Sequence, residues 1–120
     1  MTENDNTYGA WSYVDQQFSD AVETLATSFD SNLNRMCSAL SQLIILSEEQ
    51  FPDQDIYMRY NSLKIRATEH GPYYSGATMI YGALQNTLKR RRRSTFERYA
   101  EEIFSIAALV TERRGAPPTF

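Results

Sequence analysis

Cysteine, histidine and tryptophan each occur only once in the 120 residues, and glycine and proline are sparse, with five and four. A single cysteine excludes an internal disulfide, and one cysteine with one histidine leaves too few soft ligands for a zinc site. No apolar run approaches the roughly 18 residues of a membrane span, so we expect no membrane partner. The opening residues 1–9 are acidic and polar, unlike a secretory signal. We therefore expect a soluble, cytoplasmic protein.

Motifs of the common enzyme classes are also missing. The only glycine-rich stretch, residues 71–76, lacks the lysine and the preceding strand of a phosphate-binding loop. His70 stands at a predicted helix end, where a solvated histidine is commoner than a catalytic one. Cys37 lies on an apolar stripe, where a free cysteine usually packs as a small hydrophobic side chain. The sequence thus predicts a protein that is not an enzyme and holds no cofactor and no metal.

Apolar residues recur with a period near 3.6 through almost the whole chain, which is typical of amphipathic helices. Five such stripes are present, over residues 11–29, 33–44, 56–67, 77–88 and 96–110. We expect an all-α fold: a single compact bundle of about five helices with short loops, forming one domain over residues 1–120. Residues 1–10 are expected to form a flexible acidic arm. Residues 115–120, which contain two prolines, are expected to form a non-helical tail.

Short polar residues stand where these helices should begin. Their side-chain oxygens can accept hydrogen bonds from the first backbone amides of a helix. The expected N-caps are, in chain order, Ser31 or Asn32, Asp53 or Asp55, and Ser75. Ser94 and Glu97 fit a capping box, in which each side chain accepts from the backbone amide of the other residue. We therefore expect the last helix to start at Ser94.

The net charge of −3 conceals a strong asymmetry. Residues 1–55 contain ten acids and one base, a charge of −9, whereas residues 56–120 contain eleven bases and five acids, a charge of +6. Nearly half of the bases of the second part form one run, from Lys89 to Arg93. A partner meets the local charge rather than the sum, so the second half is a candidate basic surface.

The basic run allows several interpretations. Its first residues can satisfy the carbonyl end of the preceding helix while the others keep a corner of the bundle hydrated. Alternatively, its guanidinium groups contact phosphates, whose oxygens match them in pairs. A targeting signal or an acidic protein partner is a third interpretation. The candidate nucleic-acid contacts are Lys89, Arg90, Arg91, Arg92, Arg93, Arg98, Arg59, Lys64 and Arg66.

Three tyrosines lie partly outside the apolar stripes: Tyr57, Tyr73 and Tyr74. Aromatic rings of this kind can stack on nucleobases. They can equally seal the edge of a helical bundle with their hydroxyl groups in water. Sequence alone leaves both roles open.

The last part of the chain also resembles a known family. The features that carry the resemblance are Phe96, Glu97 and Arg98, then Ile103, residues 105–108, and Gly115. Together they resemble the last helix of the small helical subunit of type III (Csm-type) CRISPR effector complexes, and the resemblance extends over residues 56–115. The chain departs from that family at residues 109–111, which replace an aromatic close, and in its acidic first half. The resemblance implies a non-catalytic filament subunit that lines the guide–target duplex through its backbone.

These observations favour a non-catalytic small helical subunit of a CRISPR-type, RNA-guided nucleoprotein complex. Its basic half is expected to contact a nucleic-acid backbone, with RNA favoured. Its acidic half is expected to contact protein subunits of a larger complex, copies of itself among the candidates. The alternative is a small acidic helical adaptor, or a phage or viral inhibitor, that acts through protein–protein interaction.

Overall fold

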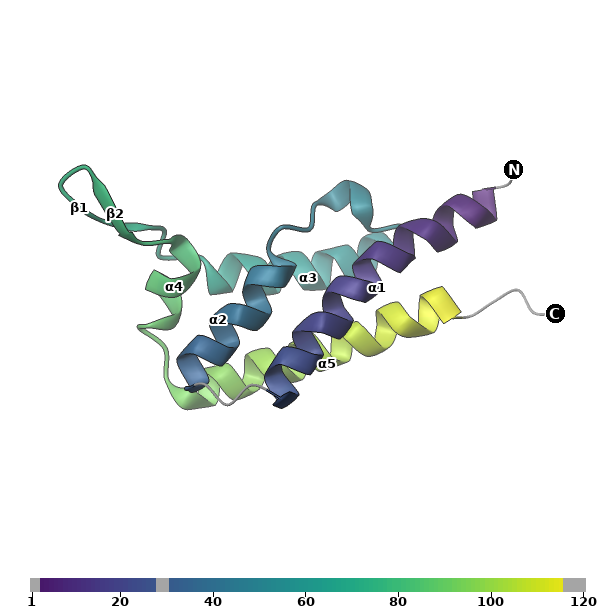
Figure 1. Ribbon diagram of the computed structural model, residues 1–120. Coiled ribbons are helices and arrows are strands. Elements are labelled where there is room, and N and C mark those ends of the chain that lie inside the picture. The colour runs from purple at the N-terminus through teal and green to yellow at the C-terminus, as the bar shows by residue number, and fades with distance from the viewer. Residues whose placement is uncertain (1–2, 28–30, 116–120) are drawn as a thin grey trace.

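The computed structural model describes residues 3–27 and 31–115, and over these residues it confirms an all-α bundle with five α-helices (Figure 1). In chain order the elements are α1 (Glu3–Thr27), α2 (Asn32–Leu43), the 3₁₀ helix η1 (Glu48–Gln50), α3 (Gln54–Ala67), β1 (Tyr73–Ser75), β2 (Thr78–Tyr81), α4 (Ala83–Leu88) and α5 (Arg93–Gly115). Phe29, which was expected in the first stripe, lies outside the described residues, as do residues 116–120 of the expected tail.

Helix α1 packs against both α2 and α5, and α3 packs against another flank of α5 (Figure 1). Helices α1 and α3 both run antiparallel to α5, as one contact of each with the end of α5 shows. Asp15 of α1 accepts a hydrogen bond from the Thr111 hydroxyl at 2.9 Å, near the end of α5. Asp53, at the start of α3, pairs with Arg113. Helix α5 thus presents different flanks to α1 and α3, and this separates its exposed side chains into two groups.

The predicted stripes form one hydrophobic core. Its fully buried large side chains are Tyr60, Phe18, Leu40, Leu43, Leu46, Ile56, Leu63, Leu88, Ile103, Ile106, Val14 and Val110. All of these except Leu46 lie on predicted stripes, which confirms the helical periodicity at the middle of each helix. Leu46, together with Phe51, belongs to the connection between α2 and α3 and closes the core from outside the helices.

Two of the predicted N-caps are confirmed. The Ser31 hydroxyl accepts a hydrogen bond from the Asn34 amide at 3.2 Å, at the start of α2. The Asp53 carboxylate accepts from the amides of Asp55 and Ile56 at 2.8 and 3.2 Å, at the start of α3. Each cap satisfies amides that have no partner within their own helix, and so it fixes where the helix begins.

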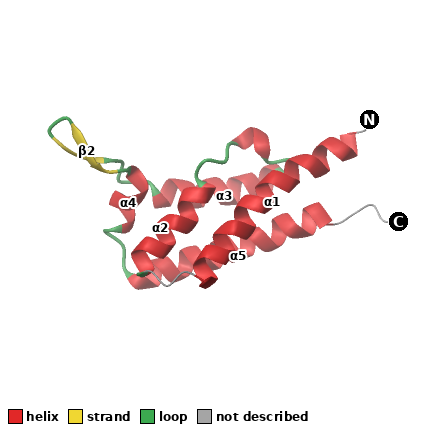
Figure 2. Cartoon of the chain, viewed as in Figure 1, coloured by secondary structure: helices red, strands yellow, loops and turns green. Residues whose placement is uncertain are grey.

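The fourth predicted helix is wrong in its first half. Residues 73–81 form a two-stranded antiparallel hairpin that projects from the bundle (Figure 2), and only Ala83–Leu88 is helical. Ser75 pairs with Thr78 across a two-residue turn, in which Gly76 has a φ of 65° and Ala77 a negative φ. Glycine with positive φ at the first position is the pattern of a type II′ hairpin turn. Ser75 therefore ends a strand instead of capping a helix.

The first and last helices of the chain, α1 and α5, both begin earlier than expected. Helix α5 begins at Arg93, and the Thr95 and Phe96 amides donate to the Arg92 carbonyl at 3.0 and 3.3 Å. The Ser94–Glu97 capping box is therefore wrong, because Ser94 lies inside the helix. Helix α1 likewise includes residues 3–10, where an arm was expected.

Candidate nucleic-acid interface

The basic run lies where α3, α4 and α5 meet. Its amides at Lys89, Arg90 and Arg91 donate to the last carbonyls of α4, each at 3.0 Å, so the run turns tightly from α4 towards α5. The end of α4 is anchored to the loop after α3. There the Thr87 hydroxyl accepts from the His70 amide and the Asn86 amide side chain donates to the Gly71 carbonyl, both at 3.0 Å. The basic run therefore follows a helix end that is hydrogen-bonded to the loop after α3.

Three arginines from distant parts of the chain line one pocket of about 300 Å³. Arg66 comes from the end of α3, Arg91 from the loop between α4 and α5, and Arg98 from the second turn of α5. The remaining lining residues are Glu69, Thr95 and Tyr99. We call this the arginine pocket. Its three cations and single carboxylate give it a charge of +2 within a small volume.

Two of these arginines are held by carboxylates. Arg91 lies 2.8 Å from Glu69, and Arg66 lies 2.6 Å from Glu102 of α5. Arg98 makes only a long contact, 3.5 Å, with the Thr95 hydroxyl. Each ion pair is partly exposed to solvent, so it contributes little stability and can be exchanged for another anion at small cost. The pocket thus combines two positioned guanidinium groups with one that has no carboxylate partner among the described residues.

Three other bases are chain neighbours of Arg91 and have no carboxylate partner in the described part of the chain. Arg90 and Arg92 are exposed, and the Lys89 ammonium lies 4.6 Å from the centre of the Tyr81 ring, a cation–π contact. We call the six bases Arg66, Lys89, Arg90, Arg91, Arg92 and Arg98 the basic corner. With Glu69 and Glu102 beside them, the corner has a net charge of +4.

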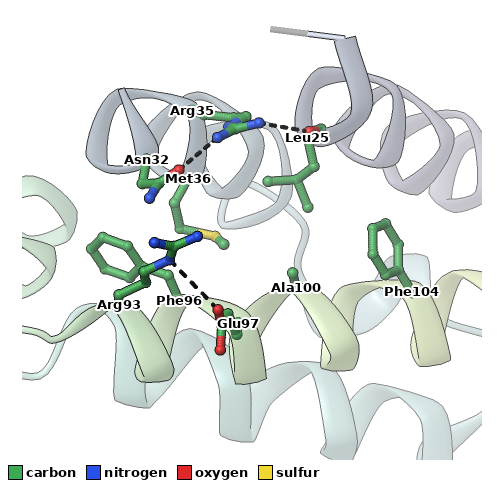
Figure 3. A pocket seen from close by; sticks show the side chains of 9 residues that line it. All are labelled: Leu25, Asn32, Arg35, Met36, Arg93, Phe96, Glu97, Ala100 and Phe104. Carbon is green, nitrogen blue, oxygen red and sulfur yellow. Dashed lines mark hydrogen bonds and ion pairs between the residues drawn. The ribbon is translucent and has the colours of Figure 1, made fainter. Parts of the chain in front are cut away.

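Arg93 does not belong to this corner. It lines a different pocket, between α5 and the α1–α2 region, where it pairs with Glu97 at 3.6 Å (Figure 3). Arg93 and Arg98 are five positions apart, which places them about 140° apart around the helix. The basic run is therefore divided between two flanks of α5, whereas the sequence suggested one cluster.

Arg59 and Lys64 lie on different sides of α3. Arg59 donates to the Ser105 hydroxyl of α5 at 2.9 Å, two turns along α3 from Arg66 and on the same flank. It extends the basic surface along the seam between α3 and α5. Lys64 is about 140–160° around the helix from Arg59 and Arg66, and it is half-buried. Lys64, although a candidate contact, therefore does not share the flank of Arg59 and Arg66.

The three tyrosines have separate roles. Tyr57 is half-buried, with its ring centre 5.5 Å from that of Phe51, and so it seals the bundle edge. Tyr73 and Tyr74 are exposed on β1, and the Tyr73 ring lies 6.0 Å from Tyr81. Because Tyr81 contacts Lys89, the hairpin places the exposed Tyr73 ring near the basic corner, whereas Tyr74 pairs with Met79 nearer the tip of the hairpin. Rings in this position are available for stacking on bases.

Cys37 and His70 are the two other side chains whose chemistry the sequence raised. Burial raises the pKa of the Cys37 thiol, which disfavours the nucleophilic thiolate. His70 is exposed, with Nε2 3.4 Å from an Arg91 nitrogen. Within residues 3–27 and 31–115, no group of three or more His, Cys, Asp or Glu side chains is placed to hold a metal ion. No helix of the described chain is both long and apolar enough to cross a membrane.

Comparison with protein-family models, with curated proteins and with solved structures gave no match to this chain. The case for a function therefore depends on the geometry of the chain itself. Glu69, Thr95 and Tyr99 complete the arginine pocket but were not anticipated from the sequence. Nothing in their spacing marks them, because the pocket forms only when the end of α3 packs beside the start of α5.

Proposed function

We propose that this protein binds a nucleic-acid phosphate backbone, with RNA favoured, through the basic corner. The arginine pocket is the observation that carries the proposal. Three guanidinium groups from three elements converge on a volume large enough for a phosphate group. Guanidinium groups match phosphate oxygens in pairs and stay charged at every physiological pH, so such a pocket favours a phosphate over a neutral ligand.

The surroundings of the pocket support a polymer rather than an isolated phosphate. Lys89, Arg90 and Arg92 are neighbours of the pocket residue Arg91 in the chain, and Arg59 continues the basic surface along the seam of α3 and α5. Bases spread over such a surface contact successive phosphates and release their counterions. Contacts of this type position a strand without reading its sequence. The exposed rings of Tyr73 and Tyr74 would add stacking on unpaired bases, which favours a single strand.

In this proposal the protein is a non-catalytic subunit of a nucleoprotein complex. The resemblance of residues 56–115 to the small subunit of Csm-type complexes is consistent with that role. The alternative is a protein-binding adaptor or inhibitor, and its acidic surface would include Asp20 and Glu23 on α1. Asp15 is excluded from that surface because it is buried.

The proposal is tested by measuring binding to a fluorescent single-stranded RNA over a range of salt concentrations. Arg66→Gln and Arg98→Gln should each weaken binding severalfold and flatten the logarithmic salt slope by about 0.7, because each removes one phosphate contact. Lys64→Gln is the matched control. It removes the same charge from α3 at a position facing away from the pocket, and it should change little.

Equal effects of all three substitutions would contradict the pocket as the binding site and indicate a diffuse electrostatic attraction. Absence of RNA binding even at low salt would contradict the proposal altogether. If reversing Asp20 and Glu23 then released a protein partner, the adaptor would be the function.

A further inference from the structure

A groove between α1 and α5 lies on a flank of α5 that faces away from the arginine pocket. It consists of two adjoining hollows that share Phe104. The first, of about 270 Å³, lies between the end of α1, the start of α2 and the first half of α5 (Figure 3). The second, of about 670 Å³, lies between α1 and the second half of α5. No part of the proposed RNA-binding surface lines either hollow.

The walls of this groove are mainly apolar. Val22, Leu25, Phe96 and Ala107 are half-buried there, against the hydrophobic core. Phe104 stands where the two hollows meet and is 45% exposed. Aromatic side chains in a hydrophobic depression are the usual anchors of protein interfaces. The groove therefore has the composition of a contact surface.

Charged residues of opposite sign mark the two hollows. Arg35 and Arg93 line the first, and Figure 3 shows Arg93 and Phe104 at opposite ends of it. Glu23 and Glu112 line the second, and no base of the described chain lies within ion-pair distance of either carboxylate. Glu97 also lines the first hollow, yet its contact with Arg93 is 3.6 Å long and largely exposed to solvent, with 80% of the Arg93 side chain accessible, so it contributes little.

This arrangement is complementary to itself. The midpoint between Arg93 and Glu112 falls between residues 102 and 103, within one turn of Phe104. If two copies met with antiparallel α5 helices about a twofold axis level with residues 102 and 103, Arg93 of each would lie level with Glu112 of the other, with Arg93 about 20° and Glu112 about 80° around α5 from Phe104. A twofold contact repeats every pairing once, so it satisfies both charged ends while it covers the apolar centre.

We propose that the α1–α5 groove binds a second copy of this chain, forming a twofold dimer whose axis lies within one turn of Phe104. The two Phe104 rings fill the shared hollows, and the Arg93–Glu112 pairs between copies fix the antiparallel direction. The arginine pockets remain open on other flanks of both copies. The dimer thus presents two basic corners, and it does not depend on whether those corners bind RNA.

Sedimentation equilibrium at low salt tests the dimer. The wild type should dimerise, and Phe104→Ser should weaken the dimer by about tenfold or more, because it removes the central aromatic contact. Met58→Ser is the control, since Met58 is 61% exposed on α3, away from the groove, and should leave the dimer unchanged. Circular dichroism would establish that both variants are folded.

Charge reversal tests the direction of the dimer independently of Phe104. Arg93→Glu and Glu112→Arg should each weaken it, and the double variant should recover most of the wild-type affinity. A wild-type chain that stays monomeric at about 100 μM would overturn the proposal and leave the groove to a different protein. Failure of the double variant to recover would also overturn it.

Discussion

Tyr60 shows how one polar group can be built into this core. Its side chain is fully buried, and its hydroxyl lies 2.6 Å from the Leu43 carbonyl and 2.7 Å from the Leu46 carbonyl. Both carbonyls belong to the end of α2 and the turn that follows it. The Leu43 carbonyl also accepts from the Leu46 amide at 3.0 Å, so the phenol matters most as the donor to the Leu46 carbonyl. Burial raises the pKa of Tyr60, because the phenolate would lose its hydration. The phenol thus links α3 to the end of α2.

Replacing Tyr60 by Phe should destabilise the fold by about 1–3 kcal/mol, since the Leu46 carbonyl loses its donor. It should also change the response to alkali. The unfolded phenol ionises near pH 10, before the folded one, so wild-type stability declines as the pH rises above about 10. Urea unfolding at neutral and alkaline pH should show that the variant lacks this part of the decline. An identical pH dependence in both proteins would contradict the buried phenol.

At the same scale, the sequence predicted some roles and missed others. Ser31 and Asp53 act through amides two or three residues away, so their roles as caps follow from local sequence. The division of the basic run does not. Whether Arg93 faces α1 and Arg98 faces α3 depends on the residue at which α5 begins and on which helices flank it.

At the scale of elements, α5 carries the core and both proposed surfaces on separate flanks. Ile103 is completely buried at its middle, with the groove on one side and the basic seam on the other. A helix that packs on several sides loses more from a cavity than one that lies on the surface. Its core face should therefore control the stability of the whole bundle.

We expect Ile103→Ala to reduce the free energy of unfolding by roughly 2–4 kcal/mol. Ile65→Ala provides a matched control, because Ile65 is 58% exposed on α3 and the same atoms are removed. This control should cost under about 0.5 kcal/mol, because alanine is the better helix former. Urea denaturation measures both. Similar losses at the two positions would mean that the α5 stripe is not the core.

The hairpin is the element that the sequence analysis missed. Apolar residues between positions 77 and 88 fit a helical stripe, but the stretch around them favours strands. Tyr73, Tyr74, Thr78 and Tyr81 are good strand formers, and Gly76 and Gly82 weaken a helix. The hairpin also makes few contacts with the bundle, and all three residues of β1 are exposed. A strand without a buried face does not need alternating apolar residues, so the sequence shows no strand pattern there.

At the scale of the whole molecule, the packing of α3 beside α5 converts a linear charge pattern into a site. Arg66 and Arg98 are 32 positions apart in the sequence, and only their shared pocket gives them a common role. Most of the bases were expected from the sequence, whereas Glu69, which pairs with Arg91, was not. In the proposed function this pocket is an anion site whose affinity is limited by its own carboxylate.

Glu69→Gln therefore tests the account most directly. Removing the single carboxylate that lines the pocket should tighten single-stranded RNA binding at low salt by about fivefold, since one charge at close range contributes about 1 kcal/mol. Glu101→Gln, the same change at an exposed position of α5 outside the pocket, should have a much smaller effect. The gain from Glu69→Gln should disappear when Arg66 and Arg98 are also replaced. If Glu69→Gln leaves the affinity unchanged, or tightens it no more than Glu101→Gln does, the arginine pocket is not where the backbone binds.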